Sequence, residues 1–225
     1  MYIYNPSNEP LIENRLKQAE SILKKIQIKH CFITGSFLYK KDAKDIDIFI
    51  ISRSRKKISI QGASVTRIDF NDMYSLFFHS ISKTCVSKNP LPCKPVKVTM
   101  SDYWSVINEA IPTILNNKDN FRKEIRFLVL YTEYLKNNII LDTFGLKKKI
   151  DSFRDYQEVL DYIDAEAPPI INKNNKPSYI KRMYYSLSRF YDEVDEYYSE
   201  NLLKKLALSV VRASRDASKI SSQSP

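Results

Sequence analysis

Glycine is scarce in this chain of 225 residues, which contains only Gly35, Gly62 and Gly145. A dinucleotide-binding fingerprint and a phosphate-binding P-loop each need two or more glycines within a short span. A collagen repeat needs one at every third position. Three widely separated glycines therefore exclude all three arrangements, and any phosphate-binding site must work with very little glycine.

Cysteine and histidine are also few, at three and two residues. The unevenly spaced Cys31, Cys85 and Cys93 are too few for a disulfide framework or a four-ligand zinc site, and His30 and His79 show no zinc-ligand spacing. A reducing, intracellular compartment is the simplest interpretation. Because the N-terminus lacks the pattern of a signal peptide and no run reaches about 18 apolar residues, we expect a cytoplasmic protein without a membrane partner.

Positive charge is concentrated in the first half of the chain. The whole chain has 36 Lys and Arg against 26 Asp and Glu. Residues 1–100 hold 17 basic and 8 acidic side chains, a net of +9, whereas residues 101–225 hold 19 and 18. A field of this sign concentrates polyanions such as nucleotides and nucleic acids, although a lysine-rich surface can also serve solubility alone.

The first 90 residues combine the patterns of helices and strands. Apolar residues at spacings of three and four predict an amphipathic helix at 10–29, and a second helix is expected after residue 72. Short apolar or alternating runs predict three strands, at 31–34, 45–52 and 63–70. In the last of these strands, Val65, Arg67 and Asp69 would share one face.

A different pattern follows the segment at 88–97, which holds three prolines in ten residues and is predicted to be a connection. Beyond it the spacing is helical almost throughout, and Pro168 and Pro169 are expected to end the third helix. Two further helices are expected after residue 177. We therefore predict an α+β protein with one domain at 1–90 and an all-helical domain at 91–225.

The residues that could carry chemistry lie between 31 and 69. The apolar run at 31–34 leads into Gly35 and Ser36, and Asp45 and Asp47 open the next strand after eight intervening residues. Carboxylates at i and i+2 on a strand project to the same face, about 7 Å apart along the chain, and magnesium prefers such hard oxygen ligands. Glycine would let a phosphate approach the backbone closely, and Ser36 and the following amides could donate hydrogen bonds to it.

This pattern resembles the nucleotidyltransferase superfamily, which includes DNA polymerase beta and the minimal nucleotidyltransferases. The resemblance rests on GSFLYKKDAKDID at 35–47 and covers residues 10–70 at most. It implies a small mixed β-sheet with flanking helices and a third carboxylate on a neighbouring strand. Asp69 is the candidate for that carboxylate, and Asp42 and Asp72 are its rivals.

The resemblance further implies an enzyme that binds ATP or another nucleoside triphosphate and moves the nucleoside monophosphate to an acceptor hydroxyl, releasing pyrophosphate. Asp45, Asp47 and Asp69 would hold two magnesium ions that stabilise the attacking and leaving oxygens, and Asp69 could help to deprotonate the acceptor. The candidates for binding the nucleotide are Gly35, Ser36, Lys40, Lys44 and Arg67. Lys44 stands where the family usually has a small residue, and the family's common glycine within the interval is absent.

The acceptor stays open between an RNA end, a protein side chain and a small molecule, and the basic first half favours RNA. The stretch RSRKK at 53–57 could follow a nucleic-acid backbone or be a solvated hairpin. The helical domain could bind the acceptor or form a homo-oligomer. The alternatives are a non-catalytic module, antitoxin-like or nucleic-acid-binding, on a nucleotidyltransferase fold, and a basic α+β domain in which Gly-Ser and Asp-x-Asp coincide by chance.

Overall fold

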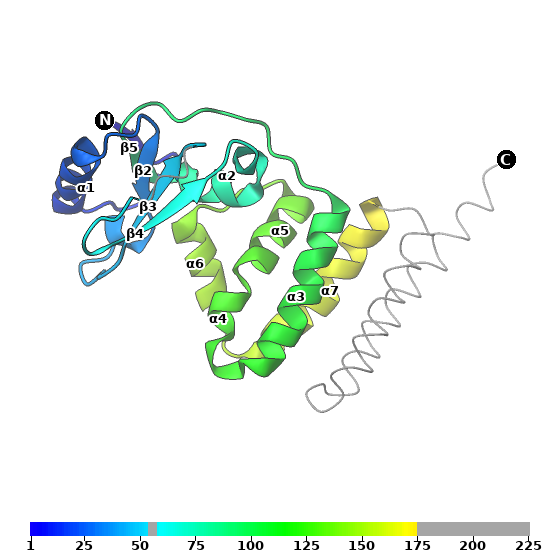
Figure 1. Ribbon diagram of the computed structural model, residues 1–225. Coiled ribbons are helices and arrows are strands. Elements are labelled where there is room, and N and C mark those ends of the chain that lie inside the picture. The colour runs from blue at the N-terminus through cyan, green and yellow to red at the C-terminus, as the bar shows by residue number, and fades with distance from the viewer. Residues whose placement is uncertain (54–57, 175–225) are drawn as a thin grey trace. The chain divides into compact units, whose positions relative to one another are not determined.

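The computed structural model describes residues 1–53 and 58–174, and it confirms the predicted α+β class (Figure 1). The chain divides into two compact units. The first unit comprises Met1–Lys97 together with Ile140–Lys148, and the second comprises the rest. Among the described residues, no helix combines the length and apolar character that crossing a membrane requires.

A five-stranded mixed sheet in the order β1-β5-β2-β3-β4 forms the centre of the first unit. Its strands are β1 (Tyr2–Tyr4), β2 (Cys31–Thr34), β3 (Ile46–Ile51), β4 (Ala63–Ile68) and β5 (Cys85–Ser87). Only β3 and β4 run parallel, and the other neighbours are antiparallel. The three predicted strands are all present, whereas β1 and β5 went unpredicted because three residues are too few to show an alternation.

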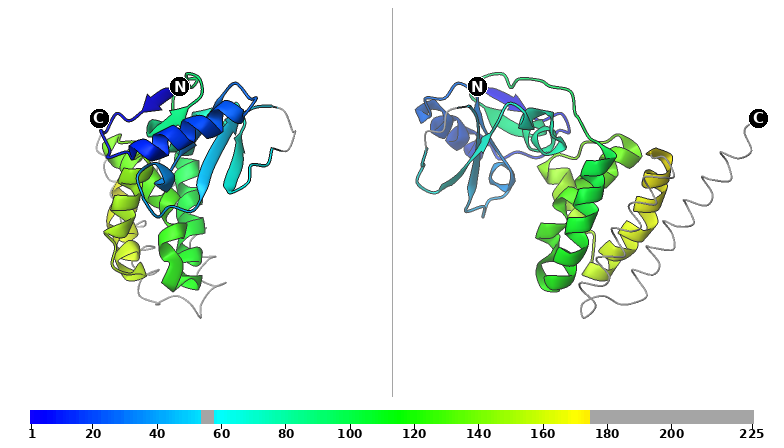
Figure 2. Two further views of the ribbon diagram at one scale, coloured as in Figure 1. Left: turned by 90° about the vertical axis from the view of Figure 1, so that its left-hand side faces the viewer. Right: turned by 45° about the vertical axis from the view of Figure 1, so that its right-hand side comes forward.

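The two faces of this sheet are covered by different helices. The helix α1 (Glu13–Lys25) lies across one face (Figure 2), where Ala19 and Leu23 are buried against Ile33 and Ile48 of the sheet. The other face packs against η2 (Asp72–Tyr74) and α2 (Leu76–Lys83), as their buried positions show: Phe32, Phe49, Ile51, Ile68, Met73, Phe78, Ile81 and Cys85. Alternation along each strand therefore assigns every strand residue to one of two chemically distinct environments.

The segment Ile140–Lys148 belongs to the first unit, although the sequence placed it in the helical domain. The Ser80 hydroxyl donates to the Leu141 carbonyl at 2.6 Å, and the Lys83 ammonium donates to the Ile140 carbonyl at 2.7 Å. The helix α6 (Thr143–Asp151) begins here. The first unit is thus built from two stretches of chain, and the expected boundary between residues 90 and 91 lies before its first stretch ends at Lys97.

The described part of the second unit is helical. Its elements are α3 (Met100–Asn116), η3 (Lys118–Asn120), α4 (Phe121–Glu124), α5 (Arg126–Asn137), the end of α6 and α7 (Tyr156–Asn174). Thr99 caps α3, in a capping box with Asp102. The helices expected after residue 177 lie outside the described residues.

The expectation that Pro168 and Pro169 end the third helix is wrong, because α7 continues through both prolines to Asn174. Proline removes a backbone donor from a helix and normally interrupts it. Here Ala167 and Ile170, on either side of the prolines, are buried in the core. Packing on both sides of the prolines therefore outweighs the local preference.

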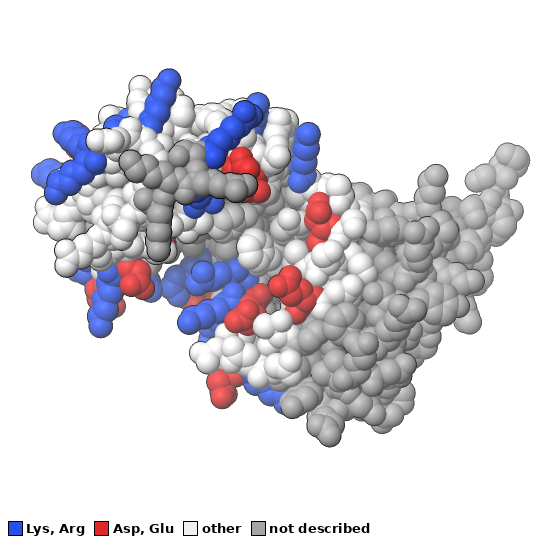
Figure 3. All heavy atoms as spheres, viewed as in Figure 1, with Lys and Arg blue, Asp and Glu red and all other residues white. Residues whose placement is uncertain are grey.

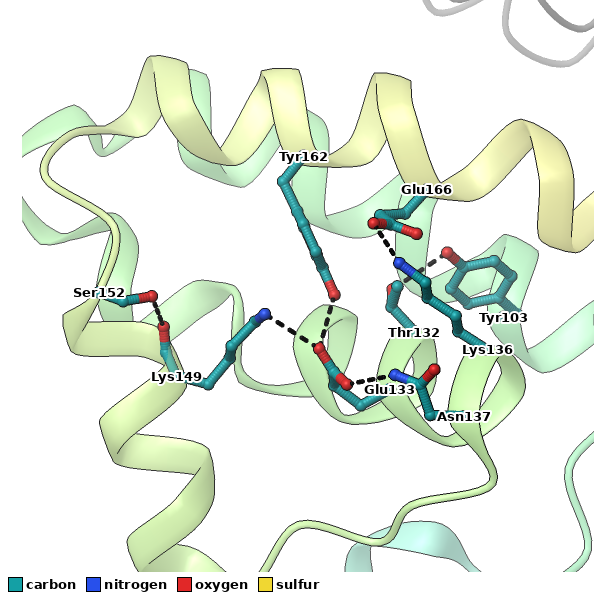
Figure 4. A network of polar contacts seen from close by, with 9 residues as sticks. All are labelled: Tyr103, Thr132, Glu133, Lys136, Asn137, Lys149, Ser152, Tyr162 and Glu166. Atoms are coloured by element: carbon teal, nitrogen blue, oxygen red, sulfur yellow. Dashed lines mark hydrogen bonds and ion pairs between the residues drawn. The ribbon is translucent and has the colours of Figure 1, made fainter.

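A polar network links α3, α5, α6 and α7 within this unit (Figure 4). The Glu133 carboxylate forms an ion pair with Lys149 at 3.2 Å and accepts hydrogen bonds from Asn137 and Tyr162. Lys136 pairs with Glu166 at 2.6 Å. Apart from the hydrogen bond between Asn137 and Glu133, which both lie in α5, these contacts join side chains of neighbouring helices, and we interpret the network as structural.

Candidate functional site

A tight turn follows β2 at Gly35 and Ser36. Gly35 has a φ of 84°, in the region that favours glycine, and its carbonyl accepts a hydrogen bond from the Leu38 amide at 3.1 Å. The turn continues as η1 (Ser36–Leu38), and the Ser36 carbonyl accepts from the Lys40 amide at 2.8 Å. A Cβ atom at position 35 would lie 3.0 Å from Oδ2 of Asp47. Only glycine therefore lets the Asp47 carboxylate approach the turn this closely.

Asp45 and Asp47 stand at the start of β3, beside this turn. Asp45 is exposed and directly precedes the strand, while Asp47 is half-buried and pairs in register with Thr34, the last residue of β2. The strand therefore begins one residue later than predicted, with Asp47 inside it and Asp45 just before it. The structure thus brings Gly35, Asp45 and Asp47 together where β2 ends and β3 begins.

The structure does not bring Asp69 to the place where β2 ends and β3 begins. Asp47 pairs with Ser64 in the parallel strand β4, so Asp69 lies five residues further along, about 16 Å at the rise of an extended strand. Its Oδ1 accepts a hydrogen bond from the Phe70 amide at 2.6 Å, and its own amide donates to Asp72 at 3.0 Å. Asp69 and Asp72 are therefore bonded within a turn at the far end of β4.

Arg67 also differs from its predicted place. Because Asp47 and Ser64 are opposite each other, Ser64 and Thr66 share the face of Asp47, and Arg67 projects to the opposite face, that of α1. The expected alternation of Val65 and Arg67 is present, but their shared face is the one that Asp47 does not use. In the described ranges, no group of three or more His, Cys, Asp or Glu residues is arranged to hold a metal ion.

The interval between the turn and Asp45 is held by Arg15 of α1. Its guanidinium donates to the Lys41 carbonyl at 2.7 Å and lies 4.8 Å from the centre of the Phe37 ring. Lys40 is half-buried beside η1, and Lys44 is exposed next to Asp45. Both lysines therefore lie near the turn. The role of Arg15 was not predicted, because the sequence of a helix does not indicate which distant carbonyl an arginine side chain contacts.

Asp142 reaches the same region from the second stretch of the unit. The Thr34 hydroxyl donates to the Thr84 carbonyl at 2.8 Å, and the Thr84 hydroxyl donates to Oδ2 of Asp142. Oδ1 of Asp142 accepts from the Gly145 amide at 2.8 Å, which caps α6. This buried chain of contacts ends at Thr34, the register partner of Asp47. The capping pattern was visible in the sequence, but nothing in it connects Asp142 with Thr84.

An aromatic contact closes the turn on its other side. The rings of Tyr39 and Phe144 meet edge to face, with centroids 5.2 Å apart and an interplanar angle of 83°. Phe144 lies in the first turn of α6, so this helix begins beside the residues that follow η1. This pairing could not be predicted from the sequence, because the two residues lie on separate stretches of the chain.

The electrostatic character of the first unit is strongly basic. Its two stretches hold 19 Lys and Arg against 9 Asp and Glu, a net of +10 that equals the net charge of the whole chain. Lys and Arg side chains project from several sides of this unit in Figure 3. An anionic ligand is therefore favoured near the first unit, and the second unit contributes no net charge.

No protein-family model matches this chain, and neither does a curated protein or a solved structure. The functional assignment therefore rests on the fold and on the residues of the site. What these residues define is an α+β unit with two neighbouring carboxylates beside a glycine-serine turn in a basic environment.

Proposed function

We propose that the first unit is a magnesium-dependent nucleotidyltransferase. It binds a nucleoside triphosphate at the Gly35–Ser36 turn and at Asp45 and Asp47, and it transfers the nucleoside monophosphate to an acceptor hydroxyl. The approach of the Asp47 carboxylate to Gly35 carries this proposal. It places a turn that a phosphate can approach next to the oxygen ligands that a phosphate-bound cation needs.

The residues fit magnesium, because Asp45 and Asp47 offer carboxylate oxygens at the start of β3. Bound magnesium would neutralise the charge that develops on the phosphate oxygens. The Ser36 hydroxyl and backbone amides at the start of η1 would donate to the phosphates, and Lys40 and Lys44 would add positive charge. As in the prediction from the sequence, two magnesium ions would bind, but Asp69 would not be one of their ligands.

In the reaction, the acceptor oxygen forms a bond to the α-phosphorus as the bond from that phosphorus to the bridging oxygen breaks. Pyrophosphate leaves with the bonding electrons, and the proton of the acceptor hydroxyl passes to solvent. Asp69 is assigned no part in this proton transfer, because the register of β4 holds it about 16 Å from Asp47 along the strand.

The test is transfer of label from each α-labelled nucleoside triphosphate, with magnesium, to total RNA, lysate protein or a small-molecule pool. We expect the Asp45→Asn, Asp47→Asn double variant to lose at least about a hundredfold of the rate, because both proposed ligands lose their charge. Asp69→Asn is the matched control and should retain the wild-type rate within about twofold. Equal loss in both variants, or none in the double variant, would contradict the assignment.

A second candidate function is a nucleotide-binding module without transfer. The observation that favours it is the register of β4, which leaves the carboxylate pair without Asp69. Such a module would bind a triphosphate in the presence of magnesium, lose that binding in the double variant, and label none of the three pools. Transfer to any pool that depends on Asp45 and Asp47 would exclude it.

A further inference from the structure

Three aromatic rings lie close in sequence at the end of β4 and the start of α2. Phe70 and Phe77 are 38% and 36% exposed, unusual for phenylalanine, and Tyr74 lies between them in η2. Each end of this segment is partly solvent-facing, although large apolar side chains are normally buried. We define the aromatic-basic surface as these three rings with the cations that contact them: Arg53, Phe70, Tyr74, Phe77, Lys94 and Lys97.

Cations accompany these rings at short distances. The Arg53 guanidinium lies 5.0 Å from the centre of the Phe70 ring, and the ammonium groups of Lys97 and Lys94 lie 4.2 Å and 5.7 Å from that of Tyr74. The backbone supports this arrangement, since the Lys97 amide donates to the Tyr74 carbonyl at 2.8 Å. Asp69 and Asp72 lie in the same segment, and both accept hydrogen bonds from its backbone amides.

This surface leads toward the carboxylate pair. The Phe77 ring contacts that of Phe49, with centroids 6.1 Å apart, and Phe49 is two residues beyond Asp47 on the same face of β3. Next to it, β4 is the edge strand, and Ser64 and Thr66 are exposed on the same face. Phe49 itself is buried, so a chain that runs from the exposed rings to Asp47 would lie over Ser64 and Thr66 of β4.

We infer that the aromatic-basic surface binds single-stranded nucleic acid and presents its end as the acceptor. Unpaired bases stack on aromatic rings, and neighbouring cations neutralise the phosphates between them. The net charge of +10 on the first unit complements such a polyanion. A duplex hides the faces of its bases, so stacking on these rings selects a single strand. Only the role of acceptor rests on the proposed function, because binding itself needs neither magnesium nor transfer.

The experiment measures binding of the full chain to a labelled 12-nucleotide single-stranded RNA and to a duplex of the same sequence, by fluorescence anisotropy. We expect the single strand to bind at least tenfold more tightly. Phe70→Leu and Phe77→Leu keep apolar volume but remove the ring, and each should weaken binding about fivefold or more. Phe127→Leu is the matched control, since Phe127 is 47% exposed in the second unit and should leave binding unchanged.

The cations are tested through the salt dependence of binding. Lys94→Gln combined with Lys97→Gln should reduce the magnitude of the slope of log affinity against log salt by about 1.4, because two phosphate contacts are lost. Lys118→Gln is the control, since Lys118 lies 5.2 Å from the ring centre of Tyr156 in the second unit. Equal affinity for duplex and single strand, or equal effects of the surface and control variants, would overturn the inference.

The outcome is separable from that of the proposed function. Binding of the single strand, measured without magnesium or triphosphate, reports on this surface alone, because transfer needs both. RNA binding without transfer would leave this surface standing and count against the enzyme. Transfer to protein or a small molecule without RNA binding would support the enzyme and contradict the role of this surface.

Discussion

The conformation of Gly35 determines whether the Asp47 carboxylate can approach the turn that follows β2. The backbone has a positive φ, and the space of the missing side chain is taken by Asp47. Sequence reasoning could find this glycine because only three occur in the chain and one precedes a serine. It could not find the contact with Asp47, which depends on the pairing of β2 with β3.

We predict that Gly35→Ala reduces both stability and nucleotide binding, whereas Gly62→Ala reduces only stability. Both glycines have positive φ, so alanine should cost about 1–3 kcal/mol of unfolding free energy at either site. Only at position 35 would the new methyl group meet a side chain of the site. Urea unfolding followed by circular dichroism measures the first effect, and magnesium-dependent triphosphate binding the second. Unchanged nucleotide binding in Gly35→Ala would separate the turn from the site.

His79 gives the first unit a dependence on pH. Burial lowers the pKa of His79 below its usual 6.5, outweighing the nearby carbonyls of Met73 and Lys94 that raise it. A lowered pKa in the folded state means that the stability contribution is complete above pH 6.5 and is lost as the pH falls through the folded value. We expect the free energy of unfolding to fall between pH 7 and 5, and the His79→Gln variant to show a flatter profile in urea titrations. Identical profiles would remove His79 as the cause.

Among the elements, α6 depends on a single buried carboxylate at its start. Asp142 is 4% exposed and accepts from both Thr84 and the Gly145 amide. We predict that Asp142→Ala costs about 2–4 kcal/mol, because it leaves two donors without an acceptor, one of them on the buried Thr84. Asp102→Ala, which removes the exposed carboxylate that accepts from the Thr99 amide at the start of α3, should cost only about 1 kcal/mol. Denaturant unfolding of both variants compares them, and equal losses would show that Asp142 acts only as a helix cap.

The strands show which part of the element level could be predicted. A short apolar run located β2, and alternation located β3 and β4 and correctly placed Val65 and Arg67 on one face of β4. Alternation does not reveal which strands pair, in which direction or in what register, and these long-range choices put Arg67 on the face opposite Asp47 and Asp69 at the far end. The pair at Asp45 and Asp47 was predictable because only Ile46, the first residue of β3, separates the two in sequence.

At the scale of the whole molecule, the sequence shows where the charge lies along the chain, but it does not show which segments form each compact unit. The concentration of positive charge was readable from the sequence, and the structure assigns the net charge entirely to the first unit. The return of Ile140–Lys148 to that unit was not readable, because its contacts with Ser80, Lys83 and Thr84 join residues about sixty positions apart. A helical pattern locates a helix but does not indicate the unit to which it belongs.

The return of this segment sets an order of events during synthesis. When Lys97 has left the ribosome, every strand of the sheet has been made, but the buried Thr84 hydroxyl still lacks Asp142 as its acceptor. The intervening residues, Val98–Ile139, belong to the other unit. The first unit therefore reaches its final form only after much of its neighbour has emerged, and a fragment cut at Lys97 would preserve the nascent state rather than the mature one.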